Sequence, residues 1–234
     1  MFDISQETCL EAWRSGAQKL LQNNGKTFHL LTEISRPCAI DPQWLVDYSP
    51  HQVRSGANNI RDVVDTIFPI TLRNRISVRH DMSRSYLVRH RRAMRWNGNR
   101  GRWGTYFERL IAFGDNAGPN QLEQAISKLS TWPQRNTTGL VFHLSSPVTD
   151  RPRTRGGPCW HFGEILWQAN NIIDLAVVYR NHDFFNKALG NFIGLGQLLK
   201  FIAEESGKTP GKLICHSMHA FTDTKTDLQK LANI

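Results

Sequence analysis

A cysteine that follows a glycine-rich turn is the first residue in this chain that could do covalent chemistry. Cys159 comes directly after Gly157-Pro158 and is followed by Trp160 and His161. A thiolate acts as a nucleophile when its cysteine is partly exposed in an electropositive setting. Arginines that could provide such a setting are Arg151, Arg153, Arg155 and Arg180. Cys159 is therefore our candidate nucleophile, although a free cysteine is often only a small buried apolar residue.

Polar residues that suit a nucleotide follow Cys159 along the chain. The pair Arg180-Asn181 combines a guanidinium fork with a neutral donor, which fits a phosphate group. The amide of Asn191 can read the adjacent donors and acceptors of a pyrimidine edge with two hydrogen bonds. Each residue also has a common structural explanation: Asp183 could cap a helix, and His216 and His219 could be half-buried strand residues.

These residues must be positioned by helices and strands, which the apolar patterns predict. Together these elements indicate one α+β domain over residues 1–234. Apolar residues at helical spacing predict helices over 5–24, 53–68, 120–129 and 189–205. Alternating or apolar runs predict strands over 27–35, 139–144, 160–168, 172–179 and 212–219. Cys159 would then precede a strand, Asp183 would follow the next strand, and Asn191 would begin the longest helix.

Composition and charge restrict the classes of function. The chain has 234 residues, of which 40% are hydrophobic, and no run approaches the roughly 20 apolar residues of a membrane span. The N-terminus lacks the pattern of a signal peptide, so we expect a cytoplasmic protein with its four cysteines reduced. A net charge of +9 predicts an anionic partner, such as a nucleotide, a polyanionic cofactor or a nucleic acid.

The order and spacing of these residues resemble thymidylate synthase and its relatives, the pyrimidine nucleotide hydroxymethylases. That family has a Pro-Cys-His motif, then Tyr-Gln-Arg-Ser-x-Asp and an Asn, and finally a Gly-Asp-x-His-x-Tyr strand. The counterparts here are Pro158-Cys159-Trp160-His161, residues 178–185, Asn191 and residues 217–221. The likeness is good over about residues 120–223. Gly104-Thr105-Tyr106 resembles a further family segment, whereas the N-terminal third is only weakly similar.

The resemblance implies a thymidylate synthase-like fold, with a large mixed β-sheet packed by helices, and a homodimer formed through sheet faces. It also implies transfer of a one-carbon unit from 5,10-methylenetetrahydrofolate to C5 of a pyrimidine nucleoside monophosphate. Cys159 would attack C6 of the base, which splits one hard step into easier ones. Tyr106 would assist proton transfer at C5. Asp62, or its neighbour Asp65, would replace a glutamate that relays protons.

Binding roles follow from the same resemblance. The residues matched to substrate contacts are Arg180 and Asn181 for phosphate, Asn191 for the base, His219 for the sugar, and Arg135 for phosphate across the dimer interface. Those matched to the folate are Asp183 and the aromatic Trp96. Arg180 would also lower the pKa of the thiol. Asn191 favours uracil, because a carboxylate in its place would suit the cytosine amine.

Departures from the family pattern leave the final step open between methylation and hydroxymethylation. Trp160 occupies the usual place of the histidine, which moves His161 one position later, and Phe221 replaces a tyrosine that contacts the sugar. A cytidine nucleotide hydroxymethylase is the alternative enzyme, and a relative without activity is a further one.

Two functions of other classes, nucleic-acid binding and zinc binding, are alternatives to the enzyme hypothesis. Residues 73–109 hold eleven arginines with interleaved aromatic residues, a pattern that suits nucleic-acid binding or a solvated basic face. Cys159, His161, Cys215, His216 and His219 are nominal zinc ligands. Their spacing matches no common zinc motif, and Cys215 and His216 would point to opposite faces of a strand.

Overall fold

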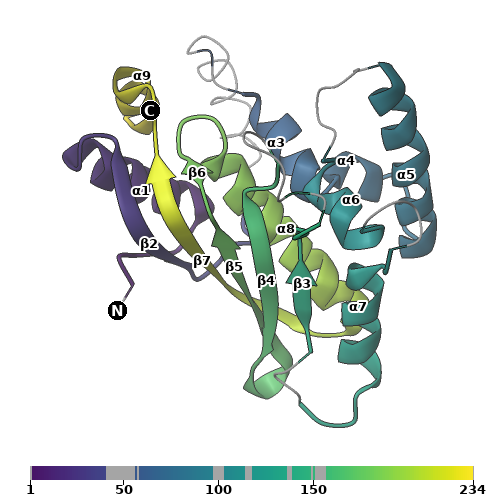
Figure 1. Ribbon diagram of the computed structural model, residues 1–234. Coiled ribbons are helices and arrows are strands. Elements are labelled where there is room, and N and C mark those ends of the chain that lie inside the picture. Colours follow the sequence, from purple (N-terminus) through teal and green to yellow (C-terminus); the bar gives the residue numbers. More distant parts are fainter. Residues whose placement is uncertain are drawn as a thin grey trace.

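The computed structural model describes residues 2–40, 56, 58–96, 103–113, 118–135, 139–148, 150 and 157–233. Figure 1 shows one twisted sheet, with helices packed along it and a further group of helices beyond one of its edges. Both predicted components, a mixed sheet and packed helices, are present, so the α+β class is confirmed.

The sheet combines parallel and antiparallel pairs. Its strands are β1 (Ile4–Gln6), β2 (Lys26–Ile34), β3 (Val141–His143), β4 (Trp160–Trp167), β5 (Ile172–Tyr179), β6 (His182–Asp183) and β7 (Thr209–Phe221). Their order is β1-β2-β7-β5-β4-β3, with the short β6 paired in parallel to β7. The parallel neighbours β5 and β7 are joined through a helix, as parallel pairs require.

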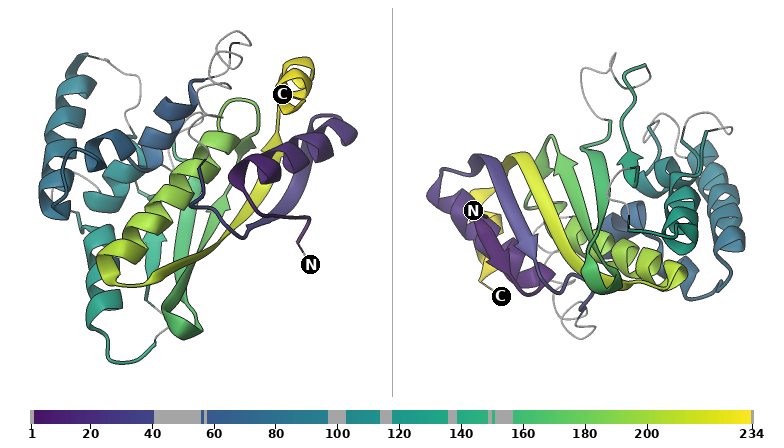
Figure 2. Two further views of the ribbon diagram at one scale, coloured as in Figure 1. Left: turned by 180° about the vertical axis from the view of Figure 1, so that it is seen from behind. Right: turned by 90° about the horizontal axis from the view of Figure 1, so that it is seen from below.

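The helices of the described chain are α1 (Cys9–Gln22), α3 (Ile60–Ile67), α4 (Ile70–Arg73), α5 (Arg79–Trp96), α6 (Tyr106–Ile111), α7 (Gln121–Thr131), α8 (Ala188–Ser206) and α9 (Lys225–Ala232). A short 3-10 turn, Ala169–Asn171, joins β4 to β5. The two views in Figure 2 show α1 and α8 along the same face of the strands. None of these helices is both long and apolar enough to cross a bilayer.

The two helices on the sheet form for local reasons that the sequence contains. Thr8 and Glu11 form a reciprocal capping box at the start of α1, which satisfies two backbone donors. Gly207 ends α8 in the left-handed conformation, at φ +66°. Almost every residue of α8 is buried, because the helix packs against β5 and β7 as well as α1, α3 and α7.

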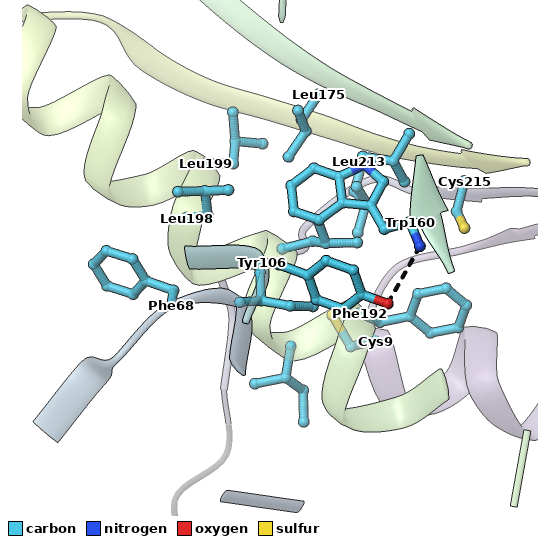
Figure 3. Close-up of a cluster of buried hydrophobic side chains, with 14 of the residues drawn as sticks. Cys9, Phe68, Tyr106, Trp160, Leu175, Phe192, Leu198, Leu199, Leu213 and Cys215 are labelled. Carbon is cyan, nitrogen blue, oxygen red and sulfur yellow. Dashed lines mark hydrogen bonds between the residues drawn. The ribbon is translucent and has the colours of Figure 1, made fainter. Parts of the chain in front are cut away.

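One continuous core runs between the sheet and α8, and part of it reaches the predicted nucleophile. Figure 3 shows Tyr106 and Trp160 within this cluster, together with Leu175, Leu198 and Leu213. Trp160 and Leu175 are fully buried. The residue after Cys159 is therefore anchored in the core, which fixes where the strand begins.

Candidate active site

A pocket of about 380 Å³ opens beside Cys159, at the end of the sheet where β4 begins and β5 ends. Six of the predicted site residues line it: Tyr106, Cys159, Arg180, Asn181, Asp183 and Asn191. They come from α6, the start of β4, the segment after β5, and the first turn of α8. The fold thus brings together residues that are up to 85 positions apart, from Tyr106 to Asn191.

Cys159 is half-buried at the mouth of this pocket. The hydroxyl of Tyr106 accepts hydrogen bonds from the backbone N–H groups of Cys159, at 3.0 Å, and Trp160, at 3.2 Å. Burial raises the pKa of the thiol, and the nearby Arg180 guanidinium opposes this change without reversing it. The predicted lowering by Arg180 is therefore present, but desolvation outweighs it.

A β-bulge follows the nucleophile. Trp160 lies opposite Tyr179, whereas Phe162 lies opposite Val178, so His161 is an extra residue in β4. The bulge lets Trp160 point into the core, where its indole packs against Gly163, at which a Cβ would lie 3.1 Å from the ring. His161 lies outside the pocket lining, and its ring nitrogen Nε2 is 3.2 Å from the Pro158 carbonyl oxygen.

Asn191 belongs to a buried chain of polar groups. Its Nδ2 lies 3.2 Å from Nε2 of His182, and Nδ1 of His182 lies 2.8 Å from the hydroxyl of Ser217. Burial lowers the pKa of His182 to about 3, so its imidazole is neutral near pH 7. Sequence reasoning did not single out His182, because its partners lie 9 and 35 residues away along the chain.

Asn181 lines the pocket and contacts the predicted His219, which is not itself part of the lining. The carbonyl oxygen of Asn181 can only accept, so Nδ1–H of His219 donates to it across 2.9 Å. The His219 ring stacks between Phe28 and Phe221, with centroids at 4.9 and 5.4 Å. This pairing places the proton of the bond on Nδ1 of His219 and fixes the orientation of the ring.

Asp183 has a structural role as well as a place in the lining. One carboxylate oxygen accepts from the backbone N–H groups of Phe185 and Asn186, and the other accepts from the Asn186 amide at 2.8 Å. The carboxylate therefore stabilises the turn that leads into α8, but it does not cap the helix, whose N-cap residue is Lys187. The pocket ammonium of Lys187 lies one turn further on, and the sequence did not indicate it.

Three predicted residues lie elsewhere. Asp62 is exposed on α3 and does not line the pocket, whereas Thr66, one turn later on that helix, does. Arg135 is exposed beyond the end of α7 and does not line the pocket. The side chain of Trp96 lies outside the described residues.

Trp103 is an aromatic residue of the pocket that the sequence reasoning missed. It is half-buried in the lining, and its ring centroid is 5.0 Å from that of Tyr106. The sequence feature that could have indicated Trp103 is its place three residues before the predicted Tyr106, next to Gly104, which has a positive φ. Trp103 is the tryptophan among the described side chains that lines the pocket.

A buried ion pair ties the start of α6 to the loop before β4. The Arg109 guanidinium binds both carboxylate oxygens of Asp150, at 2.6 and 2.9 Å, and also donates to the carbonyl oxygens of Trp103 and Leu144. Arg109 is 8% exposed. Because Tyr106 begins α6 and Trp103 precedes it, this pair helps to hold both aromatic residues at the pocket.

The arginine-rich segment divides into paired and exposed side chains. Arg79 binds Glu123 at 2.6 Å, and Arg73 binds Glu205 at 2.6 Å, so both link helices within the chain. Arg84 and Arg89 on α5 are exposed. Some arginines of the segment are thus structural, and among those that the structure describes, the exposed ones suit nucleic-acid binding.

A second pocket, of about 430 Å³, lies between α1 and α8 and is lined by residues such as Cys9, Arg14 and Ile193. It is larger than the Cys159 pocket but lacks a comparable set of catalytic groups. Burial raises the pKa of the Cys9 thiol far above its usual value. We therefore favour the smaller pocket as the candidate active site.

No protein-family model matches the chain, and no curated protein is significantly similar to it. Across the described residues, no three histidine, cysteine or acidic side chains cluster as metal ligands. The class that the fold and the pocket define is therefore an α+β protein with a cysteine, an arginine and an asparagine converging on one cavity.

Proposed function

We propose that this protein transfers a one-carbon unit to C5 of a pyrimidine nucleoside monophosphate, in the manner of the thymidylate synthase superfamily. The observation that carries the proposal is the convergence of Cys159, Arg180 and Asn191 on one pocket. These are a nucleophile, a phosphate-binding guanidinium and a base-reading amide. A thymidylate synthase-like arrangement of the sheet is part of the proposal.

The chain's own residues would act in sequence. Arg180 binds the 5′-phosphate, and Asn191 pairs with the edge of uracil. The Cys159 thiolate adds to C6, which makes C5 an enolate carbon able to attack an electrophile. After transfer, the proton on C5 must leave, and Tyr106 lies beside the nucleophile as a candidate for positioning its acceptor. Uptake of hydride from the reduced folate, or of water, at the one-carbon unit would complete the methyl or hydroxymethyl product, and the Cys159–C6 bond would then break to regenerate the thiol.

The one-carbon donor proposed is 5,10-methylenetetrahydrofolate, which supplies an electrophilic methylene group when bound. The lining fits a pterin in two respects. The half-buried Trp103 offers an aromatic face, and Asp183 offers a carboxylate that can accept from ring N–H groups. Trp103 and Asp183 are the residues that would hold it.

A homodimer that packs through sheet faces is also proposed. Along β7, Leu213, Cys215 and Ser217 are buried, whereas His216 is half-buried and Met218 is 38% exposed on the alternate positions. A second copy could cover these positions, and Arg135 would then reach the partner's nucleotide. Light scattering should give about twice the 26.8 kDa of the chain. The Arg135→Gln variant should raise KM for the nucleotide.

The test is product analysis after incubation with methylenetetrahydrofolate and, separately, UMP, dUMP, CMP and dCMP. Mass spectrometry distinguishes a methyl from a hydroxymethyl product and identifies the base and sugar. Tritium release from C5-labelled nucleotide should occur with the native protein and with Cys38→Ala, but not with Cys159→Ala. Absence of both product and release with all four nucleotides would sink the proposal. Tight, strongly salt-dependent binding of generic oligonucleotides would then favour nucleic-acid binding.

The proposal expects a cytoplasmic protein, because its chemistry needs a reduced thiol at Cys159. The four cysteines of the described chain are free. A cytidine nucleotide as substrate is the second candidate for the same site and is decided by the same assay.

A further inference from the structure

The base-reading amide is not isolated in the pocket wall. Asn191 is 4% exposed and His182 is 1% exposed, and both reach the lining of the Cys159 pocket. Asn191 follows the first residues of α8, whereas His182 lies on β6, which is paired to β7. The amide of Asn191 on α8 is therefore contacted by the His182 side chain from a separate element, β6.

The hydrogen-bond directions along this chain are determined by chemistry. Nδ2 of Asn191 can only donate, so Nε2 of His182 must accept from it. A neutral imidazole with an accepting Nε2 carries its one proton on Nδ1, which then donates to Ser217 Oγ across 2.8 Å. Burial keeps the ring neutral, since it lowers the pKa of His182 to about 3.

The surroundings hold the histidine ring in place. It stacks on Tyr179 with centroids 4.3 Å apart and planes 9° apart, and it meets the edges of Phe184 and Phe192. Ser217 is fully buried on β7. A buried imidazole held by these three rings, and by a hydrogen-bond partner at each nitrogen, is restrained against turning over.

A fixed amide reads only one pyrimidine edge. One hydrogen of Asn191 Nδ2 is taken by His182, which leaves Oδ1 and the second N–H at set positions. Uracil offers an N3–H donor beside the O4 acceptor, whereas cytosine offers the N3 acceptor beside the N4 amine donor. Turning the amide by 180° exchanges its donor and acceptor and would reverse the match.

We propose that His182, anchored by Ser217, is a positioning residue that sets the orientation of the Asn191 amide and thereby the selection of uracil over cytosine nucleotides. This inference rests on the proposed function for the selectivity, but not for the hydrogen-bond chain itself. His182 touches no reacting atom in this role. It acts through Asn191, and its effect should appear in the ratio of the two substrates.

The first experiment measures the tautomer of His182 by ¹⁵N NMR in the nucleotide-free protein. The expected result is a proton on Nδ1 and an unprotonated Nε2, unchanged between pH 8 and pH 6. A proton on Nε2 would mean that the amide of Asn191 is reversed, and this result would overturn the proposal. The measurement needs no activity, so it is independent of the proposed function.

The second experiment compares kcat/KM for uridine and cytidine monophosphates, in the deoxy or ribo series that the native protein prefers. His182→Phe keeps the stacking but removes the hydrogen bond, and the preference for uracil should fall about ten- to a hundredfold. His182→Gln should restore most of it, because its side-chain oxygen can accept from Asn191. Ser217→Ala should lower it less than His182→Phe.

Tyr179→Phe is the matched control. It keeps the aromatic ring that stacks on His182 and removes only a hydroxyl that has no partner among the described residues. Its base preference should equal that of the native protein. An unchanged ratio in His182→Phe would overturn the inference. A native protein that binds neither base would overturn the proposed function and the selectivity with it, while the tautomer would still report on the hydrogen-bond chain.

Discussion

The hydroxyl of Tyr106 accepts hydrogen bonds from the backbone N–H groups of both Cys159 and Trp160. A residue on α6 thus provides the acceptor for two backbone N–H groups at the start of β4, beside the bulge in its pairing with β5. Tyr106 is 7% exposed, and burial holds the pKa of its hydroxyl well above the usual value. Its hydroxyl therefore remains protonated, and its own proton takes part in neither of these two bonds.

Replacing Tyr106 with phenylalanine should destabilise the protein and displace the nucleophile. Two backbone donors lose their acceptor, which costs about 1–3 kcal/mol for each group left buried and unpaired. The free energy of unfolding, from urea titration, should fall by at least that amount. Tyr179→Phe serves as the comparison, because its hydroxyl has no partner among the described residues. Equal losses in the two variants would contradict the role given to the Tyr106 hydroxyl.

The reactivity of Cys159 should depend on pH in a way that Arg180 controls. Because the pKa of the thiol is raised, its alkylation rate should still be increasing with pH at pH 9. Arg180→Gln removes the neighbouring positive charge, which raises the pKa further and should slow alkylation at pH 8 about tenfold. Peptide mass spectrometry of iodoacetamide-treated protein locates the reaction.

Asp183→Asn supplies the opposite test of the same electrostatics. The carboxylate of Asp183 raises the pKa of the thiol, so its removal should lower that pKa and speed alkylation at a given pH. Arg84→Gln, on the exposed surface of α5, should change nothing. Faster alkylation in Arg180→Gln would show that the guanidinium does not stabilise the thiolate.

Removing one partner of the Arg109–Asp150 ion pair should lower the free energy of unfolding substantially. Arg109→Leu leaves the Asp150 carboxylate without its partner in a site where both side chains are about one-tenth exposed, and such a loss costs about 3–5 kcal/mol. Arg75→Leu, which alters an exposed arginine, should stay within about 0.5 kcal/mol of the native protein. Thermal or urea unfolding of the two variants makes the comparison.

Gly190 should tolerate no side chain where α8 crosses α3. A Cβ there would lie 2.7 Å from Val63, closer than carbon atoms pack, so the helices must separate. Gly190→Ala should lower stability by about 1–3 kcal/mol, although alanine is the better helix former. It should also weaken nucleotide binding, because Asn191 and Thr66 lie on the two displaced helices. Ser127→Ala, on the exposed side of α7, is the control.

The sequence predicted the elements with clear apolar patterns and missed the polar or very short ones. Residues 172–179 form the strand β5 as predicted, and α8 extends the predicted 189–205 by one residue at each end. Helix α5 was missed, because its arginines mask the apolar positions. The two-residue β6 has no pattern of its own, since only pairing with β7 makes it a strand.

Site residues were predictable only where their order along the chain carried the information. Cys159, Arg180 and Asn191 could be found in this way and do meet in the pocket. Thr66, Trp103 and His182 could not, because what brings them to the pocket is the packing of α3, α6 and β6 against other elements. Asp62 illustrates the same limit, because the predicted residue does not line the pocket, whereas Thr66, one turn later on the same helix, does.

The bulge at His161 has a consequence for how this chain should be compared with others. Because His161 is an extra residue in β4, the alternation of inward and outward side chains shifts by one position between Trp160 and Phe162. Counting positions forward from Cys159 without a gap would therefore assign Gly163 and Glu164 to the wrong sides of the sheet. An alignment that allows a one-residue insertion directly after the nucleophile would keep the strand in phase, and distant relatives of this chain should be sought with that allowance.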